Sequence, residues 1–216
     1  MRVGTYGTTA FLAFACLLLQ NACNDSAQPP NPVSGVLKPQ ESLEALVERL
    51  GGRVFPDRAE KGSWYVQLIG ATLRSSDLKQ LSAFPGIVRL ALSDSIVADE
   101  EMGNVALIHG IRVLYLSNTR VTAKGIAQLS TLPLLQELFL DNTGIHGNEF
   151  ECIGKLKGLK VLWIDSSQAT YGALPTFESH AQLEDVMMMQ GDGFTTAWSR
   201  GTGTEGRKAK YWKADR

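Results

Sequence analysis

The stretch Ile111-Arg-Val-Leu-Tyr-Leu-Ser-Asn118 decides the fold, because Leu135-Gln-Glu-Leu-Phe-Leu-Asp-Asn142 repeats its pattern 24 positions later. The same spacing extends from residue 66 to residue 188, although only 44% of the chain is apolar. Such a regular period predicts stacked units of one design. Its three apolar columns are Val66, Leu90, Leu114, Leu138, Leu162 and Val186; Leu68, Leu92, Leu116, Leu140, Ile164 and Met188; and Ile87, Ile111, Leu135, Leu159 and Leu183.

Each unit has the same internal order. A short strand such as 113–117 is followed by a turn at Asn118-Thr119, an apolar residue and a helix. One strand and one helix cannot bury their apolar sides alone, so the units must stack strand beside strand and helix beside helix. Apolar residues recur along each helix at i, i+3 and i+6, which predicts one buried stripe. These stripes are Leu78/Leu81/Phe84, Met102/Val105/Ile108, Ile126/Leu129/Leu132 and Phe150/Ile153/Leu156.

The two quoted stretches match the pattern L-x-x-L-x-L-x-x-N, and the chain therefore resembles the leucine-rich repeat family. The continuation Asn142-Thr-Gly-Ile145 is similar to the helix-containing, ribonuclease-inhibitor-like class of that family. The resemblance covers about residues 63–192. It implies an α/β fold, a right-handed solenoid with about six parallel strands on a concave face and helices on the convex face. The pattern weakens at His180, Gln190 and Gly193, where we expect the last unit to be a degenerate cap or only partly formed.

The segments that flank the repeats are predicted to differ from them. Ser42 is expected to cap a helix that ends at Gly51-Gly52, so that residues 41–62 form an N-terminal cap over the first unit. Residues 193–216 are predicted to be a basic, flexible tail. From residue 197 onward there are six basic and two acidic residues, a balance of +4. Residues 23–196 have 14 basic and 20 acidic residues, a balance of −6.

Residues 1–22 contain no acidic residue and have an apolar run that is short for a membrane span, which is the layout of a secretory signal peptide. Cys23 follows Ala22 in a way that resembles a bacterial lipoprotein signal, where acylation of the cysteine would anchor the chain to a membrane. Cleavage nearby without lipidation remains open, as does a buried helix in a cytosolic protein. Residues 23–40 are rich in proline and are expected to be a linker.

Side chains alternate along a strand, so the residue between the two leucine columns points away from the core. We expect Tyr115, Phe139 and Trp163 to lie side by side in this outward column, because adjacent strands are ~4.8 Å apart. An exposed apolar stripe bordered by carboxylates predicts an interaction surface. The column is completed by Gln67, Ala91 and Met187, and the flanking columns add Glu137, Asp141 and Asp165.

We expect this surface to bind a protein partner at the bacterial cell envelope. Tyr115, Phe139, Trp163 and Met187 would be the anchors, because aromatic groups on a rigid sheet lose little entropy on binding. Glu137, Asp141 and Asp165 would favour basic or hydrogen-donating groups. Three alternatives remain open: an envelope glycan that stacks on the aromatic side chains, a cytosolic adaptor if the N-terminus is not a signal, and coverage by the chain's own tail or by a second copy. A nearly balanced charge of 21 basic and 22 acidic residues does not favour nucleic acid as the partner.

No catalytic site, metal site or cofactor is expected. His109 and His146 belong to opposite edges of the repeating unit, and His180 falls in a core column. No His or Cys pair has the spacing of metal ligands. Cys152 is expected to be a packing residue without a disulfide partner, since Cys16 and Cys23 lie at the signal segment.

The asparagines of the repeat are expected to have a structural role. Asn118 and Asn142 would bond the free backbone groups of the turn between neighbouring units, with Asp94 and Ser166 at equivalent positions. Their substitution is expected to lower stability and to leave a binding surface intact.

Overall fold

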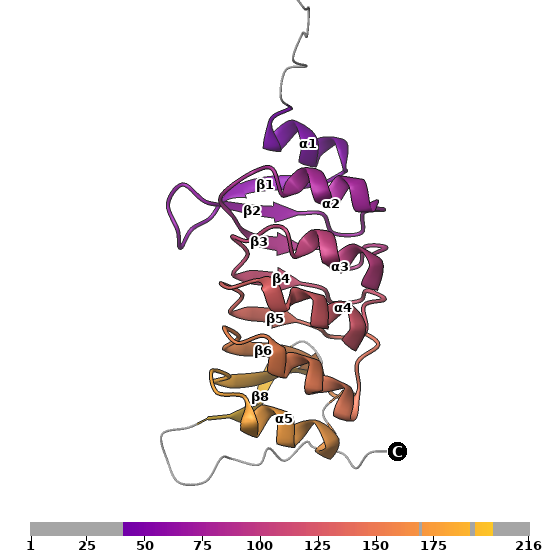
Figure 1. Ribbon diagram of the computed structural model, residues 1–216, viewed down its shortest axis with the longest axis vertical. Helices are drawn as coiled ribbons and strands as arrows, with labels where there is room; N and C mark the ends of the chain where they lie inside the picture. Colours follow the sequence, from indigo (N-terminus) through magenta and orange to yellow (C-terminus); the bar gives the residue numbers. More distant parts are fainter. Residues whose placement is uncertain (1–40, 169, 191–192, 201–216) are drawn as a thin grey trace, which may run out of the picture. The chain divides into compact units, whose positions relative to one another are not determined.

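The computed structural model describes residues 41–168, 170–190 and 193–200, which form one open sheet with helices along one side (Figure 1). The predicted signal segment 1–22, the linker 23–40 with Cys23, and residues 201–216 of the predicted tail lie outside the described residues. The α/β class is confirmed. Among the helices that the structure describes, none is both long and apolar enough to cross a membrane.

The described residues form an eight-stranded sheet whose strands follow the order of the chain. Strands β2 to β7 run parallel, at the six predicted strand positions. Strands β1 and β8 flank them in antiparallel pairing, and neither had been predicted as a strand. The strands are β1 (Arg53–Pro56), β2 (Trp64–Gln67), β3 (Ile87–Ala91), β4 (Val113–Tyr115), β5 (Glu137–Phe139), β6 (Val161–Asp165), β7 (Asp185–Gln190) and β8 (Gly193–Ser199).

The parallel strands pair in a register that equals the sequence period. Leu90 faces Leu114, Leu114 faces Leu138, and Leu138 faces Leu162, each pair 24 residues apart. These leucines are 0% exposed. The period of 24 residues is thus the length of chain that separates two paired positions on neighbouring strands.

The helices pack on one face of the sheet, where their apolar stripes join the strand leucines in a single core (Figure 1). The fourth segment is a 3₁₀ helix rather than the predicted α-helix. Its apolar residues Phe150, Ile153 and Leu156 are three apart, which places them in line in a helix of three residues per turn. The helices are α1 (Leu43–Arg49), α2 (Ser75–Leu81), α3 (Asp99–Val105), α4 (Ala123–Gln128), η1 (Leu129–Thr131), η2 (Gly147–Lys155), η3 (Tyr171–Ala173) and α5 (Leu174–Ser179).

The N-terminal end of the sheet is covered by α1 and β1. The Ser42 Oγ accepts a hydrogen bond from the Ala45 N–H at 3.2 Å, and the helix ends at Arg49, two residues before Gly51, which has a φ of +80°. The helix, its cap and its stop therefore lie at the predicted residues. The chain then turns back as β1, because Gly52 lets the backbone approach the Gln67 carbonyl of β2.

The C-terminal end differs from the prediction. Residues 193–199 had been assigned to a flexible tail, but they form β8 and pair with β7. Ala197 and Trp198 point into the core, with Trp198 only 6% exposed, so this strand closes the last unit. The guanidinium of Arg200 lies over the Trp198 ring at 5.6 Å, and its Nε donates to the Leu183 carbonyl at 2.9 Å. This strand was not predicted because the repeat pattern is weak after residue 183.

The turns after β3, β4 and β5 each have a left-handed residue. Asp94, Asn118 and Asn142 have φ values of 60°, 59° and 51°. Their side chains form a ladder, in which Asn118 Nδ2 donates to Asp94 Oδ1 at 2.8 Å and Asn142 Nδ2 donates to Asn118 Oδ1 at 2.9 Å. The predicted bonds from asparagine to the turn backbone were thus wrong in detail. Buried hydroxyls supply them instead, since Thr119 and Thr143 donate to the Leu116 and Leu140 carbonyls at 2.6 and 2.7 Å.

Candidate recognition surface

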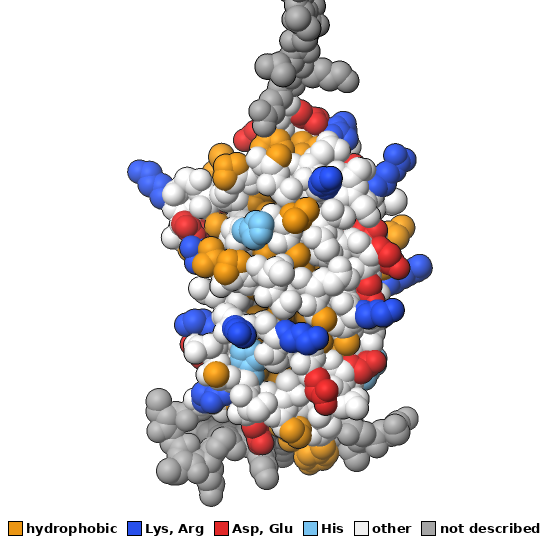
Figure 2. Space-filling view, in the orientation of Figure 1, with side chains coloured by type: hydrophobic (Ala, Val, Ile, Leu, Met, Phe, Trp, Pro, Cys, Tyr) orange, Lys and Arg blue, Asp and Glu red, His pale blue; other side chains and the backbone are white. Residues whose placement is uncertain are grey.

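The two sides of the sheet differ in character. On the side seen in Figure 2, over which α1 to α5 run, charges of both signs are interspersed with small groups of apolar atoms. On the other side, which we call the open face, the outward side chains of the strands are uncovered by helices. Tyr115, Phe139, Trp163 and Met187 of the predicted outward column are half-buried there, whereas the aliphatic residues on either side of each aromatic residue are buried.

The three predicted aromatic side chains stack on one another. The ring centroids of Tyr115 and Phe139 are 4.3 Å apart with 23° between the ring planes, and those of Phe139 and Trp163 are 4.9 Å apart with 11° between them. This separation follows from the strand spacing of ~4.8 Å, because the residues hold equivalent positions on β4, β5 and β6. Both faces of the Phe139 ring are covered by its neighbours, and the ring edges point away from the sheet.

Three further aromatic residues lengthen this stack, and sequence reasoning missed them. The Tyr65 ring lies 6.1 Å from Tyr115, and Phe55 lies 6.2 Å from Tyr65. At the other end, Phe194 of β8 meets Trp163 edge-on at 5.2 Å. We call these six side chains the aromatic row: Phe55, Tyr65, Tyr115, Phe139, Trp163 and Phe194.

The position of Tyr65 explains why the period did not reveal the longer row. Tyr65 is in register with Arg89, one column away from the predicted one. It reaches Tyr115 across β3, where the small side chain of Ala91 occupies the outward column and leaves room above it. Phe55 and Phe194 lie on the two antiparallel strands, outside the 24-residue period. Aromatic residues on unpredicted strands could not be placed on this face from sequence.

Two of the three predicted carboxylates lack a full set of hydrogen-bond partners among the described residues. Glu137 is half-buried, and no described residue donates a hydrogen bond to it. The Oδ2 atom of Asp141 accepts from the Ser117 hydroxyl at 2.9 Å, while its Oδ1 atom is buried without a partner in the described part of the chain. Burial, together with the nearby charge of Asp165, raises the pKa of Asp141 above its ordinary value. Trp163 Nε1 is a second buried polar atom without a described partner.

Asp165 has a structural role instead. Its Oδ2 atom accepts from the Asn142 N–H at 2.7 Å, and its Oδ1 atom accepts from the N–H and hydroxyl of Ser167, both at 2.6 Å. Burial acts to raise the pKa of Asp165, but the hydrogen bonds outweigh it and lower that pKa below the ordinary value. With both oxygens engaged in the turn, Asp165 is a poor candidate for contact with a partner.

A loop at residues 57–63 overhangs the start of β3 and β4. Asp57 anchors it, because Oδ1 accepts from the N–H groups of Ala59 and Glu60 and Oδ2 accepts from Arg89 Nε at 2.6 Å. Burial opposes the charge of Asp57, but these bonds hold its pKa below the ordinary value. A second ion pair joins Arg112 Nε to Glu60 at 2.8 Å. The loop is therefore fixed to the sheet at two points.

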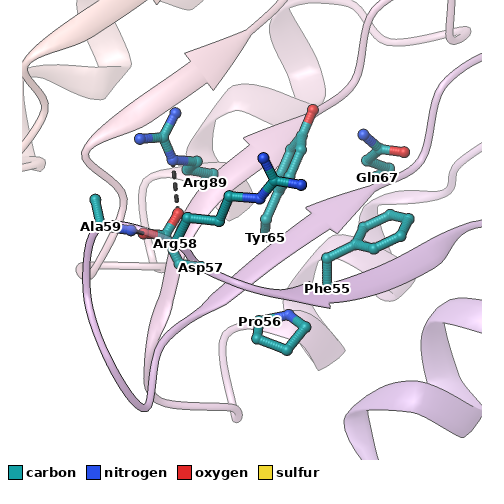
Figure 3. Close-up of a pocket in the computed structure, with 8 residues that line it drawn as sticks. All are labelled: Phe55, Pro56, Asp57, Arg58, Ala59, Tyr65, Gln67 and Arg89. Carbon is teal, nitrogen blue, oxygen red and sulfur yellow. Dashed lines mark hydrogen bonds and ion pairs between the residues drawn. The ribbon is translucent and has the colours of Figure 1, made fainter.

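The loop and the aromatic row enclose a cleft of about 400 Å³ (Figure 3). Phe55, Pro56 and Tyr65 supply apolar walls, while Arg58, Gln67 and Arg89 bring polar groups. A smaller cleft of about 280 Å³ lies on the other side of Arg89, between Arg112 and Glu137. Sequence reasoning found Gln67 and Glu137 but neither cleft, since both depend on the path of the loop.

The histidines and the described cysteine do not meet at this surface. His180 is buried, with its Nε2 atom 3.0 Å from the Leu156 carbonyl and its Nδ1 atom accepting from the Leu183 N–H at 3.0 Å. Burial raises the pKa of the Cys152 thiol to about 12, so the thiol stays protonated. His109 and His146 are exposed, before β4 and before η2 respectively. Within the described ranges, His, Cys, Asp and Glu side chains form no group of three that could hold a metal ion.

Neither a protein-family model nor a curated protein sequence matches this chain.

Proposed function

We propose that this chain is a leucine-rich repeat protein that recognises a protein partner through the open face of its sheet. The observation that carries the proposal is the aromatic row, in which six rings form a continuous apolar strip across the strands. A strip of this kind on an uncovered sheet face is typical of an interaction surface, with aromatic side chains as its energetic centre.

The ring geometry favours a protein over a glycan. Sugar rings bind aromatic side chains through the ring faces, but both faces of Phe139 are taken by Tyr115 and Trp163. The strip offers edges, which suit packing against the apolar side chains of a protein segment. Glu137 borders the same strip and favours hydrogen-bond donors on that segment.

The described C-terminal strand lengthens this face instead of covering it. β8 pairs beside β7, and Phe194 joins the row at its end while remaining 63% exposed. An open strip supports binding of another molecule over coverage by this strand.

A capture experiment with matched variants tests the proposal. The immobilised protein is compared with a Tyr115→Ala, Phe139→Ala, Trp163→Ala triple variant and with Tyr171→Ala, which removes an aromatic side chain that is 55% exposed outside the row. A partner bound by the wild type and by Tyr171→Ala but lost in the triple variant is the expected result. Equal capture by all three proteins would rule out the row as the binding surface.

A single substitution at an exposed position keeps the proposal testable if the triple variant does not fold. Phe194→Ala removes the most exposed ring of the row and is expected to weaken capture about tenfold, the loss typical of one interface anchor. Binding of soluble polysaccharide that disappears with Trp163→Ala would instead support the glycan alternative.

The proposed place of action is the bacterial cell envelope, supported by the signal-like residues 1–22 and by Cys23. Mass spectrometry of the mature N-terminus tests both points. A chain that begins at an acylated Cys23 would be a membrane-anchored lipoprotein, and one that begins nearby without lipid would be exported in soluble form. An uncleaved N-terminus in the native host would support a cytosolic adaptor instead.

A further inference from the structure

The border of the aromatic row changes its charge along the sheet. Beside β5 the polar groups are the carboxylates Glu137 and Asp141, as the sequence predicted. Beside β1 and β2 they are Arg58 and Arg89, which line the larger cleft with Phe55 and Tyr65 (Figure 3). The middle of the strip and its β1–β2 end therefore select for different chemistry.

Some polar groups of the cleft are engaged and others are free. Both oxygens of Asp57 are occupied, Oδ1 by two backbone N–H groups and Oδ2 by Arg89. Arg89 uses its Nε in that pair and also shares a side-chain hydrogen bond with Tyr115, so its guanidinium is partly engaged. Arg58 makes no ion pair with any residue that the structure describes, and its guanidinium lies over the cleft in front of Tyr65 (Figure 3). Gln67 adds a side-chain amide on the far side.

We propose that this cleft binds a carboxylate of the partner protein, carried on or next to an apolar residue. A guanidinium donates two parallel hydrogen bonds to a carboxylate, and Arg58 has no such acceptor within the described chain. The apolar part of the ligand packs between Phe55, Pro56 and Tyr65. The cleft volume of about 400 Å³ falls within the range of about 300–1,000 Å³ found for small-ligand sites.

This inference rests on the proposed recognition function and adds the chemistry of one end of the ligand. A cation is a poor occupant, because the only carboxylate among the cleft's described lining residues, Asp57, is fully engaged. The carboxylate itself could be a chain terminus or an aspartate or glutamate side chain. Short peptides separate these two sources.

The test measures binding of three acetylated peptides by protein-observed NMR. Acetyl-phenylalanine has a terminal carboxylate, acetyl-Phe-Glu-amide has a side-chain carboxylate, and acetyl-Phe-Gln-amide is neutral. We expect one or both acids to shift the amide signals of Tyr65 and Gln67, with dissociation constants on the order of millimolar, as suits ligands of this size. The acid that binds more tightly identifies the source.

Two variants make the result specific. Arg58→Gln is expected to weaken binding of the acids about tenfold and to leave the neutral peptide unchanged. Arg120→Gln, which removes the charge of another exposed arginine, is expected to bind like the wild type. Equal binding of the acids and the neutral peptide, binding unaffected by Arg58→Gln, or no shift at Tyr65 and Gln67 would each overturn the inference. Capture of the partner that still depends on Phe139 would then leave the proposed function standing.

Discussion

At the scale of single residues, the backbone explains why an asparagine follows both β4 and β5. Asn118 and Asn142 lie in the left-handed region, where most L-residues are strained and asparagine is better tolerated. The sequence pattern predicted a structural role for both correctly. It could not show that their amides bond to each other rather than to the turn, because that depends on side-chain rotamers.

The asparagine ladder yields the first prediction. Asn142→Ala is expected to lower the free energy of unfolding by about 1–2 kcal/mol, since alanine at a φ of 51° is strained and the bond to Asn118 is lost. Asn142→Gly loses the same bond without the strain, so it should cost less. Urea denaturation compares the two. A glycine variant as destabilised as the alanine variant would show that the conformation at this position does not matter.

Asp141 yields a prediction about pH. Its pKa is raised in the folded chain, so the native state binds the proton more tightly than the unfolded state does. Stability contributed by this group is present below the ordinary pKa of 3.8 and is lost as pH rises through the folded pKa. Asp141→Asn should therefore stabilise the protein at pH 7 and give little gain at pH 3. Urea denaturation at both values measures it, and a gain of equal size at the two would contradict the assignment.

At the scale of elements, regular patterns were predictable and irregular ones were not. The strand positions and helix stripes follow from apolar columns such as that of Leu114, which burial enforces. The Asp57–Ser63 loop has no such column, and its path depends on ion pairs with Arg89 and Arg112, distant in sequence. The clefts beside the loop could not be predicted for the same reason. The role of Asp165 could not be predicted either. Its carboxylate accepts hydrogen bonds from the turn that follows β6, and the repeat pattern gives no sign of these bonds.

The junction of α1 and β1 gives a prediction with its own control. A Cβ at Gly52 would overlap the Gln67 carbonyl oxygen and the side chains of Leu68 and Val47. Gly52→Ala is therefore expected to cost about 3 kcal/mol, because the overlap involves backbone that cannot move aside. Gly51→Ala has open space but a φ of +80°, so about 1 kcal/mol is expected.

Thermal unfolding monitored by circular dichroism distinguishes the two glycine variants. The melting temperature of Gly52→Ala should lie well below that of Gly51→Ala. The reverse order would mean that β1 is not held against β2 as described.

At the scale of the whole molecule, both ends of the described sheet carry an antiparallel strand that covers the last parallel one. A stack of units otherwise leaves apolar surface in water at its ends. Leu46 and Val47 of α1 are buried at one end, and Trp198 of β8 is buried at the other. The N-terminal cover was predicted from the helix pattern. At the C-terminal end a degenerate cap was one of two expectations, but β8 was not predicted, because glycine and threonine around Phe194 lack the periodic signal of a strand in the repeat.

Two aromatic residues on β8 test this arrangement, since they point to opposite faces. Trp198→Ala removes a buried side chain and should lower the free energy of unfolding by about 3–5 kcal/mol. Phe194→Ala removes a ring that is 63% exposed and should cost less than about 1 kcal/mol. Chemical denaturation of both variants measures the difference. If both variants lost equally little free energy of unfolding, residues 193–199 would not be packed against the core as described.

The interlocked rings also determine the electrostatic character of the surface they form. An aromatic ring has a negative face and a positive rim. Neighbours occupy both faces of Phe139, and one face each of Tyr115 and Trp163, so what remains outward is rim. Electron-rich atoms such as backbone carbonyl oxygens and methionine sulfur are attracted to that rim, whereas ammonium groups, which seek faces, are not. The centre of the strip is made of hydrocarbon rings, yet it presents a weakly electropositive surface to a bound partner.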